Sequence, residues 1–176
     1  MPRAALAPLP QYPFRASVKV RITDLNYGGH LGNDRMLALL HEARVAWLAS
    51  HDWSELDCAG AALIMADAAL LFQKEAFAGD VLDIEVAAGE PSRVGFRLFY
   101  RVTRPADGAR VALAETGLVC FDYGTRRLLP LPDAVRAVCL ARSAATGAEV
   151  GDAPGPAARS EGPAAGDARR RGGEAQ

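Results

Sequence analysis

The N-terminal part of the chain changes from one hydrophobic pattern to another. Across residues 14–23, Val18, Val20 and Ile22 alternate with charged residues. Successive side chains of a strand point to opposite faces, so this alternation predicts a half-buried strand. A polar, glycine-rich stretch follows, and from residue 34 to residue 50 the apolar residues recur every three or four positions. That spacing predicts a helix.

The predicted helix has a wide apolar stripe made of Met36, Leu37, Leu40, Ala43, Trp47 and Leu48. Leu39, Val45 and Ala46 extend the apolar surface around much of the circumference, so we expect the helix to be buried on most sides. Asn33 or Asp34 is a suitable N-cap, because a short side-chain oxygen can accept a hydrogen bond from a free backbone N–H group.

Four strand patterns and a short helix complete the domain. The strand patterns cover residues 61–76, 81–87, 93–104 and 109–123, and the helix covers residues 132–141. Asp107-Gly108 is typical of a tight hairpin between the last two strands. One long helix between the first strand and a run of antiparallel strands predicts an α+β fold, in which an antiparallel sheet of about five or six strands wraps around the helix.

The composition changes near Ser143. Residues 143–176 contain one large aliphatic residue, Val150, and no aromatic residue. Such a segment cannot bury enough apolar surface to offset the entropy lost on ordering, so we expect a disordered tail. Residues 1–11 are interrupted by prolines, and we expect them to be flexible. The folded domain is therefore predicted to span residues 12–142.

Composition and charge argue against several classes of partner. The formal net charge is −1, so we expect no extended positive surface for nucleic acid or an anionic membrane. No apolar stretch reaches the length of a membrane span, and the proline-broken N-terminus lacks the apolar core of a secretion signal, so we expect a cytoplasmic protein. The three cysteines have no metal-ligand spacing and no nucleotide-binding glycine motif occurs, so we predict neither a metal nor a cofactor.

The polar stretch between the first strand and the helix is the candidate for chemistry. It gathers Asp24, Asn26, His30 and Asn33 around several glycines. From the residues alone, it is either a polar loop that ends in a helix cap or a binding site, because aspartate and asparagine also favour turns. Asp24 and Asn26 are two residues apart, so in an extended segment both side chains would face the same pocket.

Four short motifs occur in order along the folded domain. Residues 24–33 read DLNYGGHLGN, residues 42–44 read EAR, residues 77–80 read FAGD and residues 126–132 read RRLLPLP. In this order and spacing they resemble the hotdog-fold thioesterases, specifically the 4-hydroxybenzoyl-CoA thioesterase-like group. The resemblance covers the whole folded domain and implies a hotdog fold, with the sheet wrapped around one long central helix.

The resemblance implies hydrolysis of an acyl-CoA or acyl-carrier thioester to a free acid and a thiol. In this group the catalytic aspartate occupies the position of Asn26, whose amide cannot accept a proton from water. The implied catalytic residues are Asp24, Asn26 and His30, with Asp24 or His30 as the base for a water held by Asn26. The implied substrate-binding residues are Gly29, Gly32, Asn33 and Glu42. Backbone N–H groups around Gly29 to Asn33 would stabilise the oxyanion.

Two other functions stay open on the sequence. The missing aspartate favours a non-catalytic acyl-CoA-binding hotdog protein. A hotdog dehydratase or hydratase would need a histidine–aspartate pair in a dedicated motif, which we do not find. The resemblance also implies a homo-oligomer, either a dimer or a dimer of dimers, with the loop at or near the subunit interface. Glu42 could be catalytic from the helix, but we expect it to pair with Arg35, Arg44 or a partner subunit.

Overall fold

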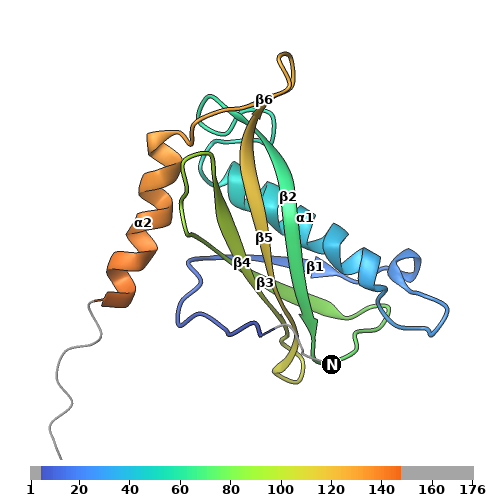
Figure 1. The fold of residues 1–176 in the computed structure, drawn as a ribbon. Coiled ribbons are helices and arrows are strands. Elements are labelled where there is room, and N and C mark those ends of the chain that lie inside the picture. Colours follow the sequence, from blue (N-terminus) through green and yellow to red (C-terminus); the bar gives the residue numbers. More distant parts are fainter. Residues whose placement is uncertain (1–4, 148–176) are drawn as a thin grey trace, which may run out of the picture.

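A computed structural model describes residues 5–147 of the chain, and within them six strands form one antiparallel sheet. The strand order is β1–β3–β4–β5–β2, and β6 pairs with β5. The strands are β1 (Phe14–Lys19), β2 (Ala62–Phe72), β3 (Val81–Gly89), β4 (Gly95–Arg104), β5 (Ala109–Asp122) and β6 (Arg127–Leu128). The helices are α1 (Asn33–Ala49), α2 (Asp133–Gly147) and the single 3-10 turn η1 (Ile22–Asp24). Figure 1 shows α1 along one face of the sheet, which confirms the predicted α+β hotdog architecture.

The hydrophobic core lies between α1 and the sheet. The helix contributes buried residues spaced three or four apart, namely Met36, Leu39, Leu40, Ala43, Trp47 and Leu48. From the sheet, β3 contributes Leu82, Ile84 and Val86, which are alternate residues predicted to share one face. Every second residue of β4 faces the same core, namely Phe96, Leu98, Tyr100 and Val102. The alternation predicted for the strands and the three- to four-residue spacing predicted for the helix therefore both match the buried faces.

The opposite face of α1 is exposed in the single chain. Ala38, His41, Glu42 and Val45 lie on it, and Val45 is 46% exposed. The prediction that the helix is buried on most sides is therefore wrong at these positions. The reason is geometric, because the sheet covers the helix from one side.

The start of α1 differs from the predicted cap. The N-cap residue is Gly32, and no side chain caps the helix, so the prediction of Asn33 or Asp34 is wrong. The N–H of Gly32 donates to the carbonyl oxygen of Asp24 (2.9 Å), and its own carbonyl accepts from the N–H of Met36 (2.9 Å). A Cβ at this glycine would lie 2.6 Å from Oδ1 of Asp34. A side chain at this position would therefore have to displace the exposed carboxylate of Asp34.

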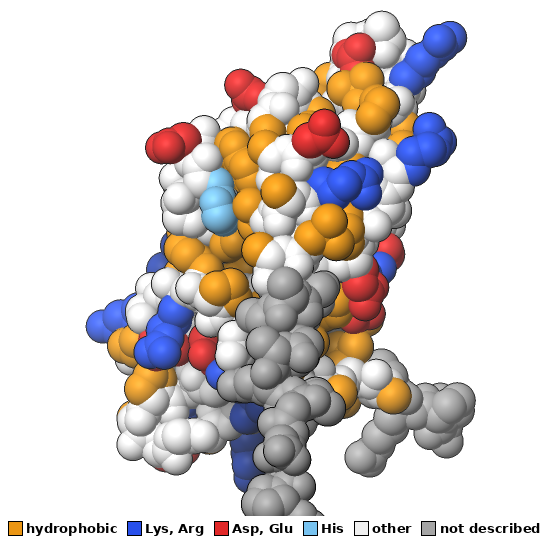
Figure 2. Space-filling view, turned by 90° about the vertical axis from the view of Figure 1, so that its left-hand side faces the viewer, with side chains coloured by type: hydrophobic (Ala, Val, Ile, Leu, Met, Phe, Trp, Pro, Cys, Tyr) orange, Lys and Arg blue, Asp and Glu red, His pale blue; other side chains and the backbone are white. Residues whose placement is uncertain are grey.

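Helix α2 packs against β3 and buries Val135 and Cys139. It continues to Gly147, beyond residue 142, where the composition predicted the end of the folded domain. Residues 148–176, most of the predicted tail, lie outside the described residues. Within the described part of the chain, no helix is long and apolar enough to cross a membrane. On the face shown in Figure 2, acidic and basic side chains are interspersed and do not gather by sign.

Candidate active site

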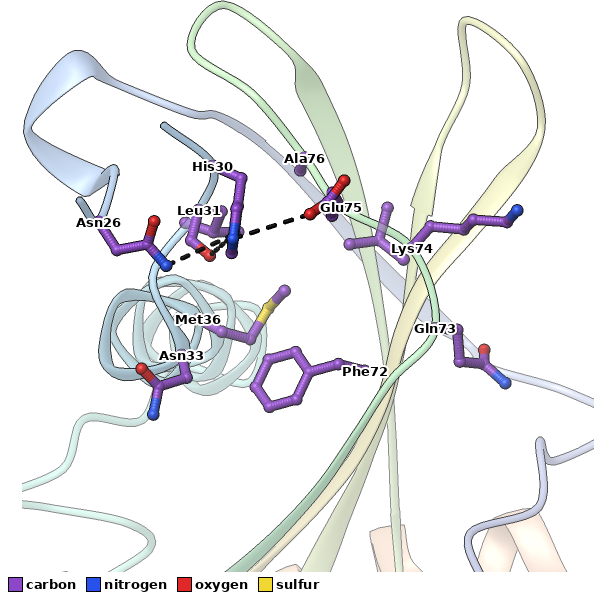
Figure 3. Close-up of a pocket in the computed structure, with 11 residues that line it drawn as sticks. Asn26, His30, Leu31, Asn33, Met36, Phe72, Gln73, Lys74, Glu75 and Ala76 are labelled. Atoms are coloured by element: carbon purple, nitrogen blue, oxygen red, sulfur yellow. Dashed lines mark hydrogen bonds and ion pairs between the residues drawn. The ribbon is translucent and has the colours of Figure 1, made fainter. Parts of the chain in front are cut away.

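A pocket opens between the glycine-rich loop and the end of β2 (Figure 3). Its volume is about 480 Å³, which is within the range of small-molecule sites. The apolar lining comprises Leu31, Met36, Phe72, Ala76 and Val111. The polar lining comprises Asn26, His30, Asn33, Gln73, Lys74 and Glu75. An apolar wall that faces a few convergent polar groups is the usual composition of a site for an organic substrate.

The loop places Asn26 beside His30. The Asn26 side-chain oxygen accepts from the N–H of Gly28 (2.8 Å), and the Asn26 N–H donates to the carbonyl oxygen of His30 (2.9 Å). Gly29 turns the chain at φ 76°, a left-handed conformation that glycine adopts without strain. The Asn26 amide nitrogen then lies 3.5 Å from Nδ1 of His30. This turn brings two of the predicted catalytic residues together.

The loop is fastened to the opposite wall of the pocket. The N–H of Leu31 donates to the carbonyl oxygen of Ala76 (2.8 Å), and Ala76 is buried. Leu31 also forms a bridge with Leu25 inside the loop. Because these bonds involve backbone groups, the loop and the segment after β2 keep a fixed separation, which a binding site needs.

Glu75 faces His30 from that opposite wall. Its Oε1 lies 3.7 Å from Nε2 of His30, and its side chain is 64% exposed (Figure 3). Sequence reasoning missed this residue. Glu75 fell inside the strand pattern predicted for residues 61–76, whereas β2 ends at Phe72. Nothing in the sequence shows that the strand ends there, beside the loop.

Asp24 does not reach the pocket, although it was predicted to be catalytic. It is 2% exposed, and its carboxylate accepts from the backbone N–H (2.8 Å) and from Nε (3.2 Å) of Arg21. Burial raises the pKa of this carboxyl, but the hydrogen bonds and charge of Arg21 outweigh burial and lower it below its usual value. The segment is not extended here, because η1 turns the chain and separates Asp24 from the face of Asn26. Asp24 therefore lies outside the pocket and is bonded within the loop, and its proposed role as a base stays a prediction.

The predicted oxyanion donors are only partly available. The N–H of Gly29 donates to the carbonyl of Asn26 (3.0 Å), and the N–H groups of Leu31 and Gly32 are also bonded within the protein. Among the described residues, the N–H of His30 has no hydrogen-bond acceptor. The other remaining donors are at the start of α1, where the first N–H groups of a helix have no intrahelical partner. Asn33 begins this turn and lines the pocket. Of the predicted binding residues, Asn33 is therefore in the pocket, whereas Gly29 and Gly32 shape the loop.

Glu42 lies on the exposed face of α1 and does not line the pocket. The predicted pairs with Arg35 and Arg44 are wrong, because Arg35 pairs with Asp34 (3.6 Å) and Arg44 pairs with Glu55 (2.6 Å). Within the described residues, no ion pair involves Glu42. Contact with a partner subunit stays a prediction.

The described residues contain no group of three or more His, Cys, Asp or Glu side chains that could hold a metal ion. Cys58, Cys120 and Cys139 are buried. Burial raises the pKa of the Cys58 thiol to about 12, which keeps it protonated and unreactive.

A single curved antiparallel sheet against one helix, with a polar loop at the start of that helix, defines the chain as a hotdog-fold protein. Residues 20–139 match the thioesterase-like superfamily, so the chain belongs to this family. It is 30% identical over 119 residues to a 1,4-dihydroxy-2-naphthoyl-CoA hydrolase of Synechococcus elongatus, an overlap that covers 65% of this chain and 85% of the relative. Both the family and the fold predicted from the sequence are confirmed.

Two solved structures support the same assignment. A 1,4-dihydroxy-2-naphthoyl-CoA thioesterase from Synechocystis superposes with a TM-score of 0.64 at 25% identity, over 72% of this chain and 95% of its own. A thioesterase from Thermus thermophilus, solved with coenzyme A and Zn, superposes with a TM-score of 0.63 at 27% identity, over 73% and 98%. The class of enzyme implied by the sequence, a thioester hydrolase, is thus the class of its named relatives.

Proposed function

We propose that the protein hydrolyses an acyl-CoA thioester in the pocket between the glycine-rich loop and the end of β2. The observation that carries this proposal is the convergence of Asn26, His30 and the first turn of α1 on one apolar-walled cavity. A thioester needs each of these parts: an apolar wall for the acyl group, polar groups for a water, and N–H donors for the carbonyl oxygen.

The roles of the groups follow from their positions. The carbonyl oxygen of the thioester lies against the free N–H groups at the start of α1, where the helix dipole favours developing negative charge. The acyl group packs against Met36 and Phe72. Asn26 and His30 hold the attacking water. Because the Asn26 amide cannot accept its proton, a different group of the pocket must do so.

Lys74 lines the same pocket and extends away from His30 (Figure 3). Its ammonium group can pair with a phosphate of coenzyme A as a point charge. We therefore place the coenzyme A part of the substrate toward Lys74 and the acyl part toward the apolar wall.

The decisive experiment is an assay of free thiol release over a panel of acyl-CoA substrates. The panel should include 1,4-dihydroxy-2-naphthoyl-CoA, because relatives carry that name, together with aromatic and straight-chain acyl groups of increasing length. We expect hydrolysis of at least one thioester. Tight binding measured by calorimetry, without thiol release from any member of the panel, would instead support the non-catalytic acyl-CoA-binding alternative.

We also propose that the functional unit is at least a homodimer that pairs through β2. This strand has eleven residues, lies at the edge of the sheet and carries one charged residue, Asp67. Ile64, Met65 and Phe72 are exposed on it. A long edge strand with exposed apolar residues is prone to aggregate unless another strand covers it. A cytoplasmic location and the absence of a nucleic-acid partner stay predictions.

A further inference from the structure

We propose that Glu75 is the general base of the thioesterase reaction, and that it supplies the carboxylate which the sequence lacks at Asn26. This inference rests on the proposed function. Of the described residues that line the pocket, Glu75 is the only one with a carboxylate.

The carboxylate of Glu75 lies next to the position that the attacking water would occupy. His30 stands between the two walls, with Nδ1 at 3.5 Å from the Asn26 amide nitrogen and Nε2 at 3.7 Å from Oε1 of Glu75 (Figure 3). A separation of 3.7 Å is longer than a direct hydrogen bond, so the carboxylate keeps its lone pairs for another donor. A water that contacts both Asn26 and His30 therefore has a proton acceptor within the same pocket.

The backbone of Glu75 is held on both sides, which a base needs for a defined position. Its carbonyl oxygen accepts from Nη1 of Arg104 (3.1 Å). The preceding residue, Lys74, donates its N–H to the carbonyl of Val111 (3.2 Å). The following residue, Ala76, is buried and bonded to Leu31 of the loop. Glu75 is thus exposed at its carboxylate and anchored at its main chain.

The other carboxylates near the loop are unsuited to this role. Asp24 is buried and bonded to Arg21. Asp34 is outside the pocket, where its side chain lies 3.6 Å from Arg35 and is 72% exposed. Glu42 is on the exposed face of α1. Among the described residues, Glu75 is the one carboxylate that lines the pocket, and its neighbour across the pocket, Nε2 of His30, is beyond direct hydrogen-bond distance.

The step balances without any further reactant. Glu75 accepts one proton from the water as the water oxygen forms a bond to the thioester carbonyl carbon, and the carbonyl electron pair moves onto its oxygen. When this tetrahedral intermediate collapses, the C–S bond breaks and its electron pair leaves on sulfur, which receives the proton from Glu75. One water is consumed, one acid and one thiol are formed, and the carboxylate is regenerated.

The test compares Glu75→Gln with the wild type in the thiol-release assay, using the best substrate of the panel. Glutamine keeps the size and polarity of the side chain but cannot accept the proton. We expect kcat to fall by about a hundred- to ten-thousandfold, the usual range for a general base, with a much smaller change in KM. Glu90→Gln is the matched control, because Glu90 is exposed and outside the pocket, and it should retain full activity. Circular dichroism should show both variants folded.

Rescue separates a base from a structural residue. Asn26→Asp added to Glu75→Gln places a carboxylate on the other side of His30, so it should raise kcat at least about tenfold above that of Glu75→Gln alone, a larger factor than Asn26→Asp gives in the wild type, where a base is already present. Wild-type hydrolysis that Glu75→Gln leaves unchanged would overturn the role of Glu75 and leave the proposed function standing. The same holds if Glu75→Gln loses activity and Asn26→Asp restores none of it. A wild type that hydrolyses no thioester would overturn the proposed function itself, and the role of Glu75 with it.

Discussion

At the scale of single residues, the two polar atoms of the Asn26 side chain have different roles. Its side-chain oxygen accepts from the N–H of Gly28 and so builds the turn. Its amide nitrogen faces His30 and the pocket. An aspartate at this position would retain the oxygen that holds the turn. The family's carboxylate can therefore be replaced by an amide without loss of the loop, and only the proton acceptor has to be found elsewhere.

These two roles predict the effect of removing the side chains that hold the water. Asn26→Ala and His30→Ala should each lower kcat by roughly ten- to a thousandfold, the range for a lost donor or base. Asn26→Asp should raise turnover, because it keeps the acceptor for Gly28 and adds a second proton acceptor. Thiol release measures both effects. Hydrolysis that survives both alanine substitutions unchanged would place the active site somewhere else.

At the scale of elements, the sequence predicted the strands and the helix whose apolar residues recur at regular spacing. β3 could be assigned, with Leu82, Ile84 and Val86 on its buried face, because alternation is a local property. Each predicted end of helix α1 differs from the observed end by one residue, which is within the usual uncertainty of helix boundaries. What failed depended on local turns. The 3-10 turn η1 moved Asp24 out of the site, and glycine rather than a polar residue caps α1.

The role of Glu75 could not be predicted for a different reason. It lies beside His30 where the N–H of Leu31 binds the carbonyl of Ala76, a contact between segments far apart in the sequence. The spacing of apolar residues along the chain cannot predict a contact between such distant segments. The family resemblance implied site residues in the loop and, with Glu42, on the helix, but none in the segment after β2, so the carboxylate on the opposite wall was not predicted.

Arg104, at the hairpin between β4 and β5, stabilises the fold through two ion pairs and also holds the main chain of Glu75. Its guanidinium binds Asp80 (2.8 Å) and Asp107 (2.8 Å) as well as the carbonyl of Glu75. Hydrogen bonds from Arg104 lower the pKa of Asp107 from 3.8 to about 2. The pKa of Asp80 is also lowered, first by the backbone N–H of Phe77 and then by Arg104. Both carboxyls thus bind protons less readily in the folded protein than in the unfolded chain.

Arg104→Met should therefore change the dependence of stability on acid. Because the folded pKa values are depressed, the two carboxylates stabilise the fold fully above about pH 4, and this contribution is lost as the pH falls toward about 2. We expect a lower melting temperature at neutral pH and a shallower further decline between about pH 4 and pH 2 than in the wild type. Arg136→Met is the control, since Arg136 binds the carbonyl of Ser92 and has no carboxylate partner within residues 5–147. Parallel melting curves for Arg104→Met and wild type across this range would contradict the prediction.

At the scale of the whole molecule, the folded domain and the C-terminal segment should be thermodynamically separate. Residues 148–176 lack aromatic residues and hold one large aliphatic residue, so their removal should cost no apolar burial. We expect a chain truncated after Gly147 to have nearly the melting temperature of the full chain. A drop of several degrees in calorimetry would show that this segment contacts the domain.

Pairing of two molecules through β2 can be tested at the middle of that strand. Ala68 is exposed, so Ala68→Lys should leave the single chain folded. In a two-fold symmetric pair of edge strands, a central residue lies close to its own copy, so one substitution places two lysines side by side. Like charges at that distance and on an edge strand oppose pairing. We expect light scattering to give at least twice the monomer mass for the wild type and for Ala137→Lys, an equivalent change on the exposed side of α2, and the monomer mass for Ala68→Lys. A wild type that is monomeric at micromolar concentration would rule out the pair, and an Ala68→Lys dimer would place the interface away from β2.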